Sequence, residues 1–269
     1  METYKQQVIE FYNARTNYDH EENTQHPREA NLLLEYVPIQ PRQKILDIAT
    51  GTGLVAIPAA KKVGSQGHVI GVDMCPGMLH QAREKIAAQN LENIELIAAD
   101  VEEISFSEDS FDVIFCCSAI ALLTDIPAIL QKCYHYLKPG GYMAFTCPPE
   151  TAYLASVYIA TLTKTFGISL PHLLSTLGTP EKCQSLLKQV GFKDIEIAVE
   201  PRGRYHNLQN HQLSWPLINL SFKGNSLLPQ PSPEKLEELQ LAFTSEVEKI
   251  TTDKGVWEDT TTFFVRARK

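Results

Sequence analysis

The segment Ile45-Leu46-Asp47-Ile48-Ala49-Thr50-Gly51-Thr52-Gly53 decides the fold. An apolar run that ends in a glycine-rich turn is typical of a buried strand leading into a helix, because glycine lets the backbone turn tightly and approach a ligand closely. The segment also satisfies the dinucleotide fingerprint G-x-G-x-x-G/A, with Gly51, Gly53 and Ala56 at its three positions. It therefore predicts a ligand-binding strand, turn and helix, but it does not by itself identify the ligand.

Short apolar runs alternate with helical segments after this point. Such alternation predicts an α/β fold in which helices cover both faces of a mostly parallel sheet. The expected strands are 44–48, 68–72, 94–98, 111–117, 142–146, 194–199 and 260–267. The expected helices are 1–18, 26–36, 53–62, 76–89, 127–137, 179–190 and 233–250.

Three aspartates lie at the carboxyl ends of three successive expected strands, where open α/β sheets bind ligands. Asp73 can accept hydrogen bonds from a ribose diol, and Asp100 can accept one from the amino group of adenine. Asp47 would repel the pyrophosphate of a dinucleotide, whereas it suits a ligand that carries ammonium and sulfonium cations, directly or through water. The three acids together favour S-adenosylmethionine (SAM).

With these motifs the chain resembles the class I SAM-dependent methyltransferases, in particular the branch of the ubiquinone- and menaquinone-biosynthesis enzymes. Residues 45–53 match the family's first motif, and Gly71-Val72-Asp73 matches its ribose-binding acid. Ala99-Asp100-Val101 matches its adenine-binding motif. Phe111-Asp112-Val113-Ile114 matches its fourth strand, and residues 137–141 match the turn before the fifth.

The resemblance implies one domain over residues 1–269, with a Rossmann-like seven-stranded sheet whose last strand runs antiparallel beside the fifth. It also implies that residues 44–146 form the SAM-binding core and that helices within residues 1–40 cap it. The family often has a glycine at the position of Ala49. The cofactor-binding residues expected here are Asp47, Ala49, Thr50, Gly51, Gly53, Asp73, Met74, Met78, Asp100, Val101 and Ser118.

Two stretches, 151–178 and 201–232, fit the alternation poorly. Long irregular excursions from a sheet are usually lids or binding loops, so we expect both to cover a substrate. Their Leu, Phe, Tyr and Trp content favours a small, partly apolar metabolite. Tyr12 and Tyr18 fit core packing and the substrate pocket equally well. The remaining candidates are Tyr205 and Trp215 for the substrate pocket, and His206 and His211 for a catalytic base.

Composition limits the other partners. The net charge is −8, which disfavours binding to nucleic acid. The six cysteines contain no CxxC pair and no zinc-finger spacing, so we expect free thiols and no metal. A polar N-terminus, and apolar stretches far shorter than the ~20 residues of a membrane span, predict no membrane partner and a cytoplasmic location. The sequence leaves the oligomeric state open.

The sequence predicts methyl transfer from SAM to an O, N or C atom of a small metabolite. A general base is needed only if the acceptor keeps its proton until attack, which explains why no catalytic signature stands out. Two alternatives stay open. A nicotinamide-dependent oxidoreductase fits the glycine spacing, although Asp47 and Asp100 argue against it. A non-catalytic SAM-binding protein would share the cofactor motifs.

Overall fold

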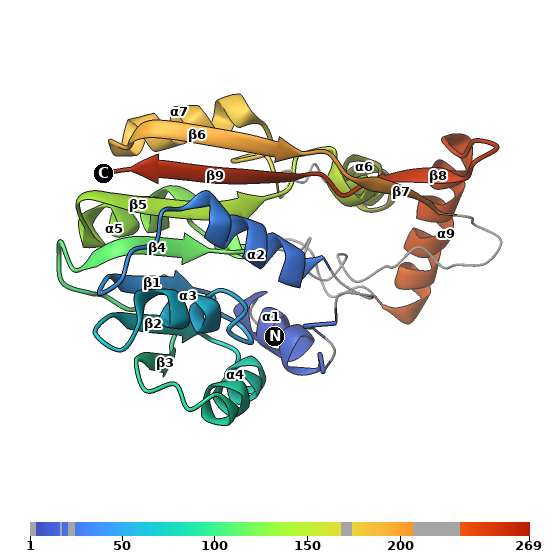
Figure 1. Ribbon diagram of the computed structural model, residues 1–269. Coiled ribbons are helices and arrows are strands. Elements are labelled where there is room, and N and C mark those ends of the chain that lie inside the picture. The colour runs from blue at the N-terminus through green and yellow to red at the C-terminus, as the bar shows by residue number, and fades with distance from the viewer. Residues whose placement is uncertain (1–3, 17, 21–24, 168–173, 207–231) are drawn as a thin grey trace.

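The computed structural model describes residues 4–16, 18–20, 25–167, 174–206 and 232–269. Its centre is a seven-stranded sheet with the order β3-β2-β1-β4-β5-β9-β6 (Figure 1). Strands β1 to β5 are parallel, and β9 runs antiparallel to both β5 and β6. The strands are β1 (Lys44–Ile48), β2 (His68–Asp73), β3 (Ile94–Ala98), β4 (Phe111–Cys116), β5 (Leu137–Cys147), β6 (Lys193–Glu200) and β9 (Thr262–Arg268). The predicted fold class and the antiparallel strand beside the fifth are confirmed.

Each central strand divides its side chains between two hydrophobic clusters, because successive residues of a strand point to opposite faces. Ile45 of β1 joins the cluster under α2 (His26–Tyr36) and α3 (Ala56–Val63). Leu46 joins the cluster under α5 (Ile126–Tyr136) and α7 (Pro180–Val190). Burial on both faces explains why these strands are apolar at almost every position.

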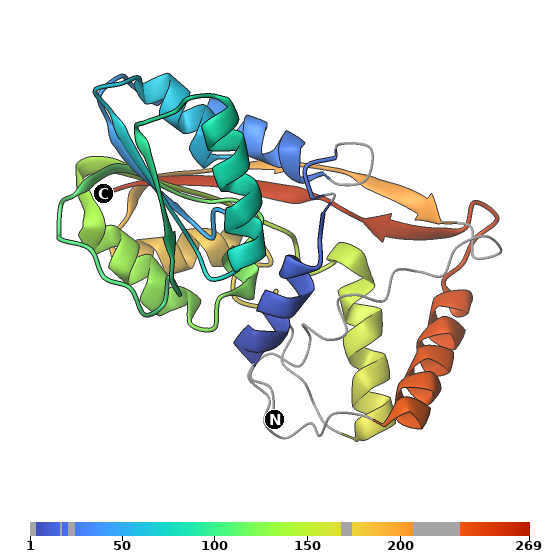
Figure 2. The same ribbon diagram turned by 90° about the horizontal axis from the view of Figure 1, so that it is seen from below.

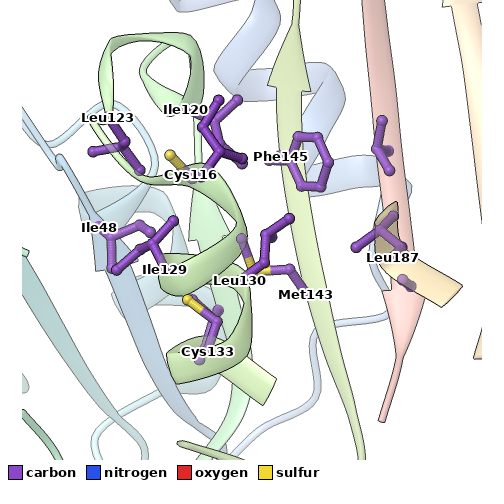
Figure 3. Packing of buried hydrophobic residues seen from close by; sticks show 14 of the residues in the cluster. Ile48, Cys116, Ile120, Leu123, Ile129, Leu130, Cys133, Met143, Phe145 and Leu187 are labelled. Atoms are coloured by element: carbon purple, nitrogen blue, oxygen red, sulfur yellow. The ribbon is translucent and has the colours of Figure 1, made fainter. Parts of the chain in front are cut away.

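The cluster under α5 shows how the helical and strand periods fit together. Ile129, Leu130 and Cys133 recur at helical spacing and face Met143 and Phe145 of β5 (Figure 3). All five side chains are at most 3% exposed. Close packing of this kind holds the sheet rigid beneath the loops at its carboxyl edge.

A second structural unit extends beyond the sheet. The strands β7 (Gly203–His206) and β8 (Val256–Asp259) pair antiparallel, and the helices α6 (Ala155–Phe166) and α9 (Pro233–Lys249) lie side by side beneath them (Figure 2). The stretch 151–178, expected as irregular, thus contains a helix of three turns. Strand β8 was not predicted. The short 3-10 helices are η1 (Ile120–Leu122) and η2 (Ala152–Leu154).

Two predicted helix boundaries were wrong. The first helix, α1, spans Tyr4–Asn13 and does not continue to residue 18. Helix α3 begins at Ala56 rather than at Gly53, because Gly53 has a φ of +82°, which an α-helix does not allow. The remaining helix, α4, spans Pro76–Ala88 and lies beside β2 and β3. Among the described residues, no helix is long and apolar enough to cross a membrane.

Candidate functional site

A cavity lies at the carboxyl ends of β1, β2, β3 and β4, and residues of α1 form one side of it. Figure 1 shows α1 beside this end of the strands. The sheet supplies its floor, and α1 and the segment after β4 supply its walls. The residues that line it are Tyr4, Lys5, Val8, Tyr12, Tyr18, Ala49, Gly51, Asp73, Met74, Cys75, Met78, Asp100, Val101, Glu102, Cys117, Ser118, Ala119, Leu122, Leu123 and Thr124.

The loop after β1 follows a path that favours glycine. Ala49, Gly51 and Gly53 have φ values of +54°, +55° and +82°. Ala49 stands where the family often has a glycine, and an alanine in this left-handed conformation is strained by about 1–2 kcal/mol. A Cβ added at Gly51 would lie 3.5 Å from Met78 Cε, so these two residues are neighbours in the cavity wall.

Asp73 ties the glycine loop to the end of β2. Its carboxylate accepts hydrogen bonds from the backbone N–H of Gly51 and of Cys75, both at 2.8 Å. Burial raises the pKa of Asp73, and these backbone hydrogen bonds limit the rise. A carboxylate held in this way presents its remaining lone pairs to the cavity at a fixed position.

Asp47 lies behind the loop and not on the cavity wall. Its carboxylate accepts the Thr50 hydroxyl at 2.6 Å and the backbone N–H of Ala56. It is 1% exposed, and burial raises its pKa to about 7. The structure therefore gives Asp47 a place in shaping the loop. Thr50 and Gly53 belong to the same loop and, like Asp47, do not line the cavity.

Asp100 stands at the opposite end of the cavity, after β3. It forms an ion pair with Lys5 of α1, whose ammonium also lies 3.0 Å from Glu102. Burial lowers the pKa of Lys5, but the hydrogen bonds to Asp100 and Glu102 outweigh that effect and raise it. This end of the cavity thus combines a carboxylate with the apolar side chains of Val101 and Leu123.

Aromatic rings line the side of the cavity that faces α1. The rings of Tyr12 and Tyr18 meet edge-on with centroids 6.2 Å apart, and Tyr18 stacks on His26 at 4.3 Å. Arg15 lies 5.0 Å from the Tyr18 ring. Burial raises the pKa of Tyr12 to about 12, so this phenol stays neutral at ordinary pH. Tyr12 and Tyr18 fitted core packing and the substrate pocket equally well in the sequence. The structure places both residues on the cavity wall.

The structure thus gathers eight of the eleven expected cofactor residues around one cavity: Ala49, Gly51, Asp73, Met74, Met78, Asp100, Val101 and Ser118. Tyr205 and His206 lie elsewhere, on β7. Tyr205 is 48% exposed and contacts Trp257, while His206 lies 2.6 Å from a carboxylate oxygen of Glu258. Neither lines the cavity. His211 and Trp215 fall outside the described residues.

Further cavity residues lie on α1. The helical spacing of Tyr4 and Val8 predicts a buried helix face, and Tyr4 fits core packing and the substrate pocket equally well. In the structure both line the cavity, and Tyr4 donates to the Leu122 carbonyl at 3.0 Å. Lys5 of the same helix was not predicted.

The sequence also did not single out Glu29 of α2, which lies outside the cavity lining and is only 4% exposed. Its neighbours Arg28, Ala30 and Asn31 form no apolar run, so nothing in the sequence signals its burial.

Comparisons with known proteins point to the same cavity-forming region. A family model described as a methyltransferase domain matches residues 45–141. The sequence is 40% identical to the aklanonic acid methyltransferase of a Streptomyces species over 106 residues, which is 39% of this chain and 48% of that protein. It is 33% identical to the demethylmenaquinone methyltransferase of Listeria monocytogenes over 111 residues, 41% of this chain and 47% of that protein. The match thus covers about half the length of each relative.

The fold recurs in a solved structure. The YcgJ protein from Bacillus subtilis superposes with a TM-score of 0.62 at 14% identity, over 91% of this chain and 99% of that one. The matched region 45–141 contains the glycine loop, Asp73 and Asp100, and the sheet order around it carries the antiparallel strand between β5 and β6. Residues 45–141 therefore match a methyltransferase domain, and their motifs indicate the class I SAM-dependent type, whose cofactor is SAM.

Proposed function

We propose that this chain transfers a methyl group from SAM to a small, partly apolar metabolite. The observation that carries the proposal is the single cavity that joins Asp73, Asp100 and the glycine loop and is walled by Tyr12 and Tyr18. Both curated relatives are named for small molecules, aklanonic acid and demethylmenaquinone. The aromatic wall favours a substrate with an apolar or aromatic part.

The chemistry of the cavity fits SAM. We assign Asp73 to the ribose, and Asp100 with Val101, Met74 and Met78 to adenine. The backbone of the loop from Ala49 to Gly51 serves the amino-acid end. SAM supplies a methyl group that its sulfonium already activates. The protein then has to align the acceptor with that methyl group and exclude water, which a cavity walled on one side by α1 favours.

The oxidoreductase alternative is weakened by Asp47. In a dinucleotide enzyme the pyrophosphate binds to the N-terminus of the helix after the glycine loop. Here the carboxylate of Asp47 already accepts the backbone N–H of Ala56, the first residue of α3. A phosphate at this place would meet a buried acid instead of a free N–H group.

Further features of the chain remain part of the proposal. We propose that residues 1–40 act as a cap and that 151–178 and 201–232 contribute to substrate choice. His206 and His211 stay candidates for a base, although His206 lies on β7 and its partner is Glu258. A cytoplasmic location and the absence of a nucleic-acid partner stay predictions from the sequence. The proposed acceptor atom is O, N or C.

The direct test is mass spectrometry of a host-cell extract incubated with the protein and deuteromethyl-SAM. We expect a metabolite that gains one labelled methyl group and that is absent when the Asp73→Ala variant replaces the native protein. If calorimetry shows no SAM binding to the folded protein, the proposal fails.

The same materials separate the alternatives. An oxidoreductase predicts enhanced NADH fluorescence on mixing with the protein and no heat of SAM binding. A non-catalytic SAM-binding protein predicts a heat of SAM binding but no labelled product from any extract. We expect SAM binding together with a labelled product and no NADH signal.

A further inference from the structure

Glu29 is a buried acid beside the cavity that the cofactor assignment leaves unused. It lies on α2, and only 4% of it is exposed. One carboxylate oxygen accepts the hydroxyl of Thr262 on β9 at 2.7 Å, and the other accepts the hydroxyl of Ser118. Ser118 lines the cavity. A short hydrogen-bonded path therefore links Glu29 to the cavity through Ser118.

The charge of Glu29 has no partner of opposite sign in direct contact. Within the part of the chain that the structure describes, no Lys, Arg or His forms an ion pair with it. Burial raises the pKa of Glu29, and the hydroxyls of Ser118 and Thr262 partly offset the rise. Buried acids without a cation are costly, and they are typical of groups that gain or lose a proton in function.

Other titratable and charged groups surround Glu29 at longer range. Arg202 and Glu200, at the end of β6, act on it with opposite signs. Tyr18, Cys117 and Tyr153 face it from the loop before α2, the end of β4 and η2. Burial raises the pKa of each of these three groups, so none of them ionises before Glu29.

The position of Ser118 in the sheet order decides what Glu29 can reach. Along β3, β2, β1 and β4 the cavity presents Asp100, Asp73, Gly51 and Ser118 in turn. With adenine, the ribose and the amino-acid end of SAM assigned to the ends of β3, β2 and β1, the end of β4 is left for the methyl acceptor. Ser118 has a left-handed φ of +53°, and its backbone N–H donates to the Thr146 hydroxyl at 2.7 Å. Strained backbone held by such contacts is typical of functional positions.

Resting on the proposed function, we propose that Ser118 and Glu29 remove a proton from the acceptor, and that the acceptor is a hydroxyl or an N–H group. The lone pair of the acceptor oxygen or nitrogen forms the bond to the methyl carbon, and the carbon–sulfur bond breaks with its electron pair left on sulfur. The acceptor proton passes to the Ser118 oxygen while the Ser118 proton passes to Glu29. The products are the methylated acceptor, S-adenosylhomocysteine and protonated Glu29.

The first test uses the labelled metabolite found with deuteromethyl-SAM. Glu29→Gln should slow its formation by about 100-fold, and Ser118→Ala by at least about tenfold, since a positioned base contributes on this scale. The rate of the native protein should rise with pH as Glu29 ionises, and that of Glu29→Gln should not. Glu35→Gln changes an exposed acid on the same helix and should leave the rate unchanged.

Two controls separate proton transfer from a structural role. Thr262→Val removes the other hydroxyl that binds Glu29 but leaves the path from the cavity intact. If Glu29 only anchors α2, Thr262→Val and Ser118→Ala should slow the reaction equally, and this would overturn the proposal. Calorimetry should show that Glu29→Gln binds SAM within about threefold of the native protein, as expected for a group that does not touch the cofactor. A labelled methyl group on carbon or sulfur would also contradict the inference.

A second test needs no substrate, so its outcome stays separate from that of the proposed function. The carboxyl carbon of Glu29 is followed by NMR during a pH titration of protein labelled with ¹³C-glutamate and saturated with S-adenosylhomocysteine; Glu29→Gln assigns the signal. We expect titration above the usual range of glutamate and an upward displacement in Ser118→Ala. A carboxyl that stays protonated beyond about pH 9 cannot accept the proton, and this would overturn the inference even without a known substrate.

Discussion

At the scale of single residues, the site depends on carboxylates with different surroundings. Asp73 is held by two backbone N–H groups and borders the cavity, whereas Asp47 is buried behind the loop and bonds to Thr50. The first acid is positioned to receive a ligand, and the second shapes the loop that receives it. Two predictions follow from this difference.

Asp73→Asn should weaken the binding of SAM and leave the fold largely intact. Asparagine has one acceptor oxygen, so it cannot serve Gly51, Cys75 and a ribose hydroxyl together. Loss of hydrogen bonds to a charged group costs about 1.5–3 kcal/mol, which is about 10- to 150-fold in the dissociation constant for SAM. Calorimetry measures this change. Asp112→Asn is the matched control, because Asp112 binds Lys44 N and Lys138 Nζ at the other end of β4; equal weakening in both variants would contradict the assignment.

Asp47 should make stability depend on pH. The ordinary pKa of an aspartate is 3.8, and burial raises the pKa of Asp47 to about 7 in the folded protein, so between these values the folded state binds more protons than the unfolded state. Stability therefore falls as pH rises through this window, with a slope that approaches about 1.4 kcal/mol per pH unit. Urea unfolding from pH 4 to 8 should show that Asp47→Asn, which keeps an oxygen acceptor for Thr50, loses this slope. An unchanged slope would show that Asp47 is ionised throughout.

At the scale of secondary-structure elements, α1 covers the cavity through polar contacts at both ends. Lys5 pairs with Asp100 at one end, and at the other end Asn13 accepts the backbone N–H of Gly77, in the first turn of α4, at 2.8 Å. A Cβ at Gly77 would lie 2.9 Å from Asn13 Oδ1, so a larger residue here would displace the Asn13 side chain from this contact. These two polar contacts fasten the ends of α1, one to the segment after β3 and the other to α4.

Asn13→Ala should loosen α1 without unfolding the core. It leaves the Gly77 N–H without its partner, a loss of about 0.5–2 kcal/mol for a helix-capping contact. Hydrogen exchange should speed up within residues 4–13 but not in β1–β5, and SAM should bind up to about tenfold more weakly. Glu10→Ala, an exposed change on the same helix, should do neither. Faster exchange throughout the sheet would refute a separate cap.

At the scale of the whole molecule, the chain has a core around the sheet and a smaller one outside it. The outer cluster contains Tyr158, Leu162, Leu239, Phe243, Val247 and Val256. It joins α6, α9 and β8, and it has no member in common with the two clusters of the sheet. Such a unit can open while the rest of the structure stays folded.

Leu162→Ala and Leu130→Ala compare the two cores, since each leucine is 0% exposed. Each change should cost about 2–5 kcal/mol where it acts. Hydrogen exchange should rise in α6, α9 and β8 for Leu162→Ala, with β1–β5 unchanged. Leu130→Ala should lower the protection of the sheet itself. If Leu162→Ala destabilised β1–β5 as much as Leu130→Ala does, the two cores would form one cooperative unit.

The sequence by itself determined the strands of the sheet, the order of its acids and the class of cofactor. These features are local: a five-residue apolar run, a glycine turn and an acid at a strand end can each be recognised within one βαβ unit. The helix boundaries that were wrong depend on features that the helical pattern does not contain. These are the left-handed backbone at Gly53 and the contact of Asn13 with Gly77 at the end of α1.

Only the tertiary structure decided which residues complete the site. Lys5 meets Asp100 across 95 positions of sequence, and Glu29 meets Thr262 across 233. No spacing rule predicts such pairs, because they depend on how α1 packs at the carboxyl ends of the strands and how α2 packs on one face of the sheet. The tertiary structure likewise places Asp47 behind the loop and Tyr205 on a separate pair of strands. The segment 45–53 thus specifies a SAM site, while the packing of distant elements determines what lies beside it.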